Sequence, residues 1–196
     1  PYAPDAIIDR SSIETGYEVS IQEFKKIFLD KDETPKKFDI IKNLKENLKD
    51  NTSRYLLIIT KSSISQFLID TILKELKKEY IFFLGSRFED DINTEEYSAK
   101  NIHKIQVCME KGTITVFKNL ESIYPSLYDL FNQNFLIQDN KKYARIAIGS
   151  SNNKPYEVND NFKSIIIVDE NDILKQDPPF LNRFEKYLFS FEVLLE

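Results

Sequence analysis

Two acidic residues, Asp169 and Glu170, directly follow the apolar run SIIIV. Carboxylates at the end of a buried strand can hold a magnesium ion beside a phosphate group. The segment SIIIVDEND at residues 164–172 is therefore a candidate metal site. Apolar strands also end in acids by chance, and the competing interpretation is a central strand that ends in a polar loop. We favour the second interpretation and predict no metal here.

A second candidate is the sequence Thr60-Lys61-Ser62-Ser63, which follows the apolar run YLLIIT. A helix that starts after a strand presents backbone N–H groups that attract anions. A working phosphate loop also needs glycines, as in GxxxxGK[ST], and the chain has no glycine between Asp50 and Gly85. Lys61, Ser62 and Ser63 thus form at most a weak, degenerate nucleotide site, and the alternative is an ordinary helix cap.

The third candidate is the end of TITVFK at residues 113–118, which is followed by Asn119. Magnesium-assisted phosphoryl transfer needs an acid that holds the metal shell and another that orients water. Lys118 would repel the cation and Asn119 cannot act as a base. We therefore expect no catalytic residue at this strand end.

The segment PPFLNRFEKYLFSF places Arg183 between a proline-initiated turn and a buried strand. A rigidly held guanidinium at a domain rim suits a phosphate or carboxylate of a neighbour. The alternative is an internal ion pair with Glu185 or with an acid of residues 169–172. The sequence leaves these two interpretations open.

Composition narrows the class of protein. The 196 residues carry a net charge of −5 with both signs interspersed, which argues against a nucleic-acid surface. No apolar run approaches the ~20 residues of a membrane span, and there is no signal segment. The single cysteine, Cys108, fits a cytoplasmic protein and is predicted to be a packing residue. His103 has no second His or Cys nearby and is not predicted to bind metal.

These candidates need a scaffold of alternating strands and helices. Apolar runs predict strands, and 3.6-residue periodicity predicts helices between them. The predicted strands are residues 55–60, 80–85, 113–118, the SIIIV run and about 187–191. The predicted helices are residues 17–28, 35–49, 61–79, about 94–111 and about 122–134. Strand-like runs on either side of residues 149–153 predict a hairpin. The fold class is α/β, a three-layer sandwich with a mainly parallel sheet, preceded by a short helical segment.

The chain is predicted to divide near residue 50. Residues 1–50 form a helical lead-in or the end of a preceding module, and residues 51–196 form the α/β domain. The missing initial Met and the apolar end VLLE lead us to expect a piece of a longer protein.

The order of these segments resembles the AAA+ core of the midasin and dynein type, a P-loop NTPase-like fold. In that core, a helix ending in glycine precedes the Walker B strand, a hairpin precedes the sensor 1 strand, and a proline-containing turn carries an arginine finger. The resemblance places Walker B at residues 116–119, sensor 1 near Asp169 and the finger-like position at Arg183, so SIIIVDEND is not Walker B. The domain is the large subdomain, and the helical lid is not included.

A closer resemblance is to the mysterin-like giant AAA+ ubiquitin ligases. It is carried by RYLLIIT, IFFLGSRF, NIHKIQVCMEKG, NLESIYPSLYDLFNQ and PPFLNRFEKYLF, and it covers residues 54–192. It implies one of six fused AAA units in a dynein-like ring, some of which have lost their nucleotide motifs. The parent would be a RING-type E3 ubiquitin ligase, although this segment contains no RING-type Cys/His cluster.

The resemblance also implies partners and cofactors. The adjacent AAA+ units of the same chain would be direct partners, and ubiquitin machinery would act through the parent. ATP and Mg would bind in neighbouring modules, with no cofactor in this one. The leading hypothesis is a degenerate, non-hydrolysing coupling unit. The alternatives are a divergent ATPase that uses Lys61, Asp169 and Glu170, and a stand-alone interaction domain.

Overall fold

The computed structural model describes residues 39–61, 64–86, 94–148 and 152–189. Contact clustering divides the chain into two compact units, residues 1–39 and 40–196, and the elements below all belong to the second. The helix predicted at residues 17–28 lies outside the described residues. The compact unit begins ten residues before the predicted boundary near residue 50, because the helix at residues 40–49 packs into its core.

The second unit alternates strands with helices. Its elements are α3 (Ile40–Lys49), β1 (Leu56–Thr60), α4 (Ile64–Glu75), β2 (Tyr80–Leu84), α6 (Glu95–Lys111), β3 (Ile114–Lys118), η1 (Glu121–Leu127), α7 (Tyr128–Phe131), β4 (Leu136–Gln138), β5 (Lys141–Ile148), β6 (Asn152–Val158), β7 (Ser164–Asp169), η2 (Glu170–Lys175), α8 (Pro178–Leu181) and β8 (Glu185–Phe189). The predicted succession of strands and helices is thus present.

Five strands form one parallel sheet in the order β2-β3-β7-β1-β8. The central strand β7 is buried along nearly its whole length, as expected of a strand covered on both faces. All five carboxyl ends meet at one edge of this sheet and all five amino ends at the other. The α/β class and the mainly parallel sheet of the prediction are confirmed.

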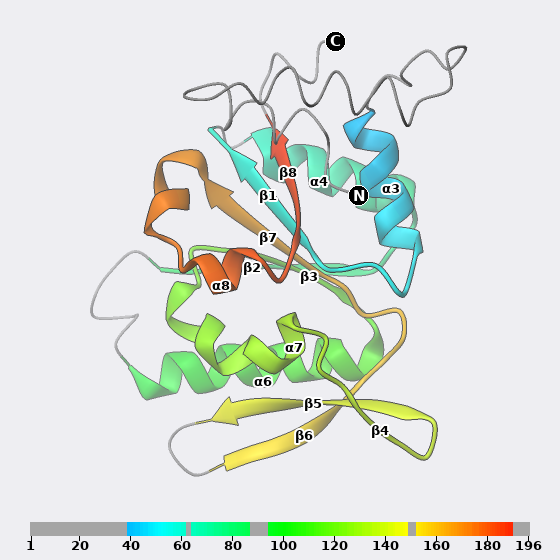
Figure 1. The fold of residues 1–196 in the computed structure, drawn as a ribbon, viewed down its shortest axis with the longest axis vertical. Coiled ribbons are helices and arrows are strands. Elements are labelled where there is room, and N and C mark those ends of the chain that lie inside the picture. The colour runs from blue at the N-terminus through cyan, green and yellow to red at the C-terminus, as the bar shows by residue number, and fades with distance from the viewer. Residues whose placement is uncertain (1–38, 62–63, 87–93, 149–151, 190–196) are drawn as a thin grey trace, which may run out of the picture. The chain divides into compact units, whose positions relative to one another are not determined.

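Alternate residues of the strands feed two separate cores. On one face, Ile58 and Val116 pack with α3 and α4. On the other face, Leu57 and Phe117 pack with α6, η1, α7 and α8. Figure 1 shows the sheet between these two helical layers. The antiparallel sheet β4-β5-β6 lies beyond the second layer and contributes Ala144 and Ile146 to its core.

The predicted helix at residues 122–134 differs from the structure. A 3₁₀ helix, η1, occupies its first half, and only one α-helical turn, α7, follows. Pro125 lies inside η1 and has no N–H group, so a regular α-helix is interrupted there. The last strand starts at Glu185, two residues before the predicted start at 187.

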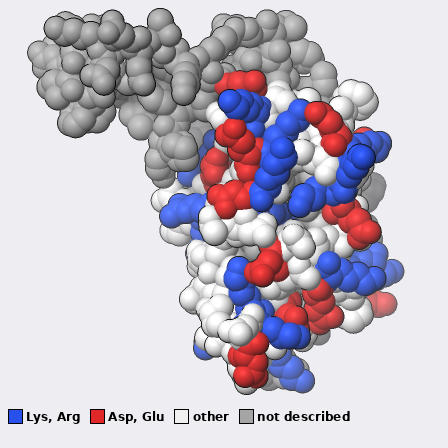
Figure 2. Space-filling model, turned by 90° about the vertical axis from the view of Figure 1, so that its right-hand side faces the viewer, with Lys and Arg blue, Asp and Glu red and all other residues white. Residues whose placement is uncertain are grey.

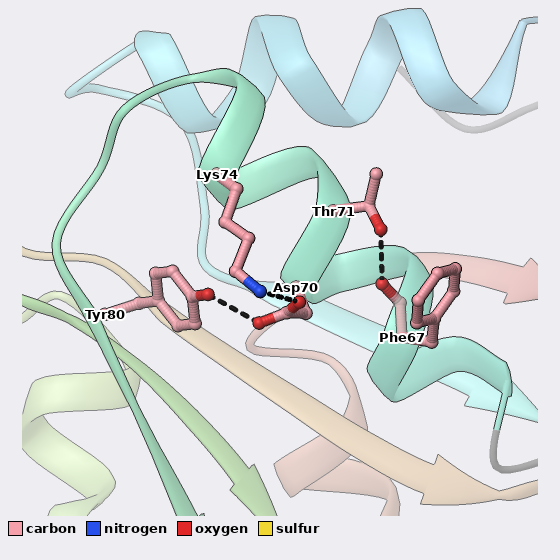
Figure 3. A network of polar contacts seen from close by, with 5 residues as sticks. All are labelled: Phe67, Asp70, Thr71, Lys74 and Tyr80. Atoms are coloured by element: carbon pink, nitrogen blue, oxygen red, sulfur yellow. Dashed lines mark hydrogen bonds and ion pairs between the residues drawn. The ribbon is translucent and has the colours of Figure 1, made fainter.

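A polar network joins α4 to the edge strand β2 (Figure 3). Tyr80 of β2 donates a hydrogen bond to Asp70 of α4, and Lys74 contacts the same carboxylate at 2.6 Å. The hydrogen bonds from Lys74 and Tyr80 lower the pKa of Asp70. These groups lie on the surface, so their contribution to stability is small, but they fix the orientation of α4 on the sheet.

A buried lysine lies at the amino edge of the sheet. Lys163 precedes β7 and is only 2% exposed, and its ammonium group donates to the carbonyl of Ser53 at 3.0 Å and to the Ser53 hydroxyl at 2.8 Å. Gln133 donates to the same carbonyl at 3.1 Å. Burial lowers the pKa of Lys163 from 10.5 to about 8, although Asp50 and Glu185 oppose the shift.

This pKa predicts a specific pH dependence of stability. Between pH 8 and pH 10.5 the unfolded chain retains the Lys163 proton and the folded chain loses it, so the free energy of unfolding rises with pH. Relative to Lys163→Met, the wild-type chain should gain up to about 3 kcal/mol across this window. Urea unfolding of both proteins at several pH values measures the difference. A constant difference would show that Lys163 titrates as an ordinary exposed lysine.

Candidate functional site

The carboxyl edge of the parallel sheet brings two of the predicted site segments together. Thr60, the last residue of β1, lies opposite Asp169, the last residue of β7. The next residues form an ion pair, with Lys61 Nζ 3.5 Å from Glu170 Oε1. The Lys61 side chain is 70% exposed, so this pair adds little stability. Ser62 and Ser63 lie outside the described residues.

Asp169 has a local structural role. Its carboxylate accepts hydrogen bonds from the backbone N–H of Asn171 at 3.0 Å and from the Asn171 side chain at 2.9 Å. This is the N-cap of η2. One carboxylate oxygen, Oδ1, receives both bonds, so the residue predicted to be sensor 1-like terminates its strand and starts the next turn.

The end of β3 closes tightly on β2. Lys118 is half-buried, and its carbonyl accepts a hydrogen bond from Gly85 N at 2.8 Å. Asn119 then adopts a left-handed conformation with φ 56° and turns the chain toward η1. A Cβ atom on Gly85 would lie 1.4 Å from the Asn119 carbonyl oxygen. The backbone of Asn119 therefore occupies the space beside Gly85 at the end of β3.

Among the described residues at the carboxyl edge, the side chains do not form a set of magnesium ligands. The described residues contain no group of three His, Cys, Asp or Glu side chains that could hold a metal. Lys61 and Lys118 bring positive charge to the edge, Glu170 pairs with the first of them, and Asp169 caps η2. Hard cations require several free oxygen ligands, which this arrangement does not offer.

Arg183 lies at the opposite, amino edge of the sheet, just before β8. Its Nε donates to Asn132 Oδ1 at 2.6 Å, and its guanidinium carbon lies 4.0 Å from the centre of the Tyr128 ring. No ion pair joins Arg183 to an acid within the described ranges, so the predicted internal pair with Glu185 or residues 169–172 is not formed. Glu185 instead accepts a bond from Asn47 at 2.7 Å.

Sequence reasoning did not single out the partners of Arg183. Tyr128 and Asn132 come from the segment after β3, and Arg54, which precedes β1, donates through Nη1 to the Asn182 carbonyl at 2.8 Å. These contacts span up to 128 residues of sequence. No local pattern marks them, because they arise from the tertiary arrangement alone.

The remaining predicted residues are readily placed. Cys108 is 2% exposed, and burial raises the pKa of its thiol, which confirms a packing role. His103 is exposed on α6. On the face drawn in Figure 2, acidic and basic side chains are interspersed. Across the described part of the chain, no helix has the length and apolar character needed to cross a membrane.

The sequence of the chain is similar to those of known proteins. A family model described as "RNF213 AAA domain" matches residues 45–195. The chain is 34% identical over 148 residues, 74% of its length, to the E3 ubiquitin-protein ligase RNF213 of Mus musculus. It is 34% identical over 151 residues, 75% of its length, to the Homo sapiens protein of that name, and 29% identical over 174 residues, 84% of its length, to the Danio rerio E3 ubiquitin-protein ligase rnf213-beta. In each case the match spans only 3% of the relative's own length.

The contact between Gly85 and Asn119 gives a direct test of the closed strand end. Gly85→Ala should lower the free energy of unfolding by about 3 kcal/mol, because the new methyl group meets backbone that must move. Chemical denaturation measures this loss, and Lys100→Ala on the exposed face of α6 serves as the surface control. Equal stability of the two variants would show that β3 and β2 do not meet as described.

Proposed function

Because this chain belongs to the RNF213 AAA domain family, we propose that it is a non-hydrolysing structural and coupling unit of an RNF213-type E3 ubiquitin-protein ligase. The observation that carries the proposal is the end of β3. Lys118 and Asn119 occupy the positions where an active AAA+ unit needs its metal-binding and water-orienting acids. A lysine opposes the metal, and an amide side chain cannot accept a proton from water.

The backbone at this site supports the same proposal. Asn119 turns away from the sheet in a left-handed conformation, and its carbonyl lies against Gly85. An acid introduced at position 119 would still sit on this turn. Recovery of activity would therefore require a different backbone path as well as different side chains.

The phosphate side of the site is also occupied by the chain's own groups. Lys61 would be the residue that contacts a nucleotide phosphate, and it pairs with Glu170. A nucleotide would have to compete with this carboxylate, and the segment offers no glycine-rich loop to add backbone N–H contacts. Nucleotide affinity is consequently weak or absent, and the unit has no cofactor of its own.

A divergent ATPase is the second candidate function. It is favoured by one observation, the convergence of Lys61, Asp169 and Glu170 at the carboxyl edge of β1 and β7. In that function Lys61 would contact phosphate and the two acids would hold magnesium. The cap role of Asp169 and the ion pair of Glu170 weigh against it.

The wider setting of the unit is part of the proposal. The chain spans about 3% of the length of its RNF213 relatives, so ligase activity would belong to other parts of a parent protein. We place this unit in a dynein-like ring beside other AAA+ units of the same chain, which bind ATP and Mg. Ubiquitin machinery would act through the parent, in the cytoplasm.

Calorimetric titration of the chain with Mg-ATP distinguishes the two functions. We expect no saturable heat and no phosphate release, because the site lacks both the glycine loop and the Walker B acids. Lys61→Ala is the matched control. Saturable binding that this variant loses, or hydrolysis that Asp169→Asn or Glu170→Ala abolishes, would overturn the coupling role and establish the ATPase.

Arg183 is the residue through which we propose contact with the adjacent unit. It lies at the amino edge of the sheet, away from the chain's own degenerate site, and its guanidinium group is oriented by Asn132 and Tyr128. Because the Arg183 guanidinium group is already oriented, it loses less conformational entropy when it binds an anionic group.

In the parent protein, Arg183→Ala should lower the rate of ATP hydrolysis several-fold, because the neighbouring unit loses a positioned cation. Asn132→Ala removes the same internal hydrogen bond and retains the guanidinium, so it is the matched control. Steady-state phosphate release measures both variants. If both reduce the rate equally, Arg183 acts only by supporting the fold.

A further inference from the structure

A small pocket at the amino edge of the sheet is separate from the degenerate nucleotide site. It has a volume of about 200 Å³. Its lining residues come from the segments before β1 and β8, from α8 and from the end of α7, and they are Arg54, Asn132, Gln133, Pro179, Asn182 and Arg183. Lys61 and Glu170 lie at the opposite edge, across the full length of β1 and β7.

The pocket has an uncompensated positive charge. Two guanidinium groups line it, and none of its lining residues is acidic. Arg183 Nη1 is buried and has no hydrogen-bond partner among the described residues. One N–H group of Arg54 donates to the Asn182 carbonyl, and its other N–H groups have no partner among the described residues. Nη1 itself is not accessible to solvent, so a ligand in the pocket would meet the other N–H groups of the two guanidinium groups.

Several donor groups of the pocket are held by internal contacts. Asn132 and the Tyr128 ring hold the Arg183 guanidinium from two sides. Gln133 is fixed by its bond to the Ser53 carbonyl, the same carbonyl that Lys163 contacts. These two hydrogen bonds to Ser53 hold the loop that carries Arg54. A site whose donors are already ordered loses little conformational entropy when a ligand enters.

Size and polarity select the ligand. Pockets for drug-sized ligands usually measure ~300–1,000 Å³, so this one takes a side chain rather than a whole nucleotide. Its lining combines guanidinium donors with amide groups, and the Asn182 amide has no described partner. Inorganic phosphate near neutral pH offers acceptors and a P–OH donor, so it is the competing ligand that the titration must compare with a carboxylate. A peptide offers carboxylate acceptors together with backbone N–H donors, which matches both kinds of group.

We infer that this pocket is a docking site for one carboxylate side chain of an acidic peptide segment, held between Arg54 and Arg183. The carboxylate accepts from the exposed N–H groups of Arg54 and from those of the partly exposed Arg183 guanidinium. The inference deepens the proposed contact of Arg183 with an adjacent unit, and it rests on that proposal only for where the segment comes from. It does not depend on whether the carboxyl edge binds nucleotide.

The test follows the arginine Nε–H resonances of the 196-residue chain by NMR at constant ionic strength. One titration uses a blocked Gly-Glu-Gly tripeptide, a second its Gly-Gln-Gly analogue, and a third inorganic phosphate. We expect saturable shifts of the Arg54 and Arg183 signals with the Glu peptide only. Arg54→Gln should weaken that binding about tenfold or more, the loss expected for a charge-assisted hydrogen bond. Arg145, exposed on β5, is the internal control.

Three outcomes would overturn the inference. They are no saturable shift with the Glu peptide, equal shifts at Arg145, and tighter binding of phosphate than of the Glu peptide. Preserved backbone spectra of Arg54→Gln, with binding retained in Lys61→Gln, show that the loss is local. Because Mg-ATP titration reports the opposite edge of the sheet, this inference and the coupling role can fail independently.

Discussion

The buried ammonium group of Lys163 organises the amino edge of the parallel sheet. It sits at the start of the central strand β7 and holds both polar oxygens of Ser53, just before β1. Ser53 also donates to the carbonyl of Asn47, and Asn47 bonds the carbonyl of Arg54 and the carboxylate of Glu185. Lys163, Ser53 and Asn47 together link α3, β1, β7 and β8. A charge buried in this way is costly, and its hydrogen bonds offset the cost only if the loop keeps one conformation.

The two edges of the sheet consequently differ in how their charges are satisfied. At the carboxyl edge, Lys61 meets Glu170, and Asp169 is used by its own cap. At the amino edge, the arginine pair at positions 54 and 183 has no acid among the pocket residues. Unsatisfied charge marks the place where a protein gains free energy by meeting a partner. The arrangement favours contact through the amino edge over chemistry at the carboxyl edge.

Local sequence patterns predict the positions of buried strands. They predict few of the side-chain contacts that form between distant segments. The apolar run at residues 164–168 predicts a central strand, because a strand covered on both faces needs apolar residues at successive positions. Lys118 and Asn119 also mark the degenerate strand end without any structure. By contrast, the pairing of Lys61 with Glu170 depends on β1 and β7 being neighbours in the sheet, and the partners of Arg183 come from distant segments. Pro125 was a visible sign that the helix predicted at residues 122–134 would be interrupted, although the periodicity around it was helical. The packing of α3 into the core depends on tertiary contacts and has no such local sign.

The residues that form the two cores differ from the residues at the carboxyl strand ends. Val116 and Phe117 of β3 are fully buried and pack into the two cores, whereas Lys118 and Asn119 lie beyond them at the strand end. Most of the stabilisation comes from burial of apolar surface, which substitutions at the strand ends leave unchanged. Substitutions at the strand ends can therefore change the chemistry of the unit and leave its two cores intact.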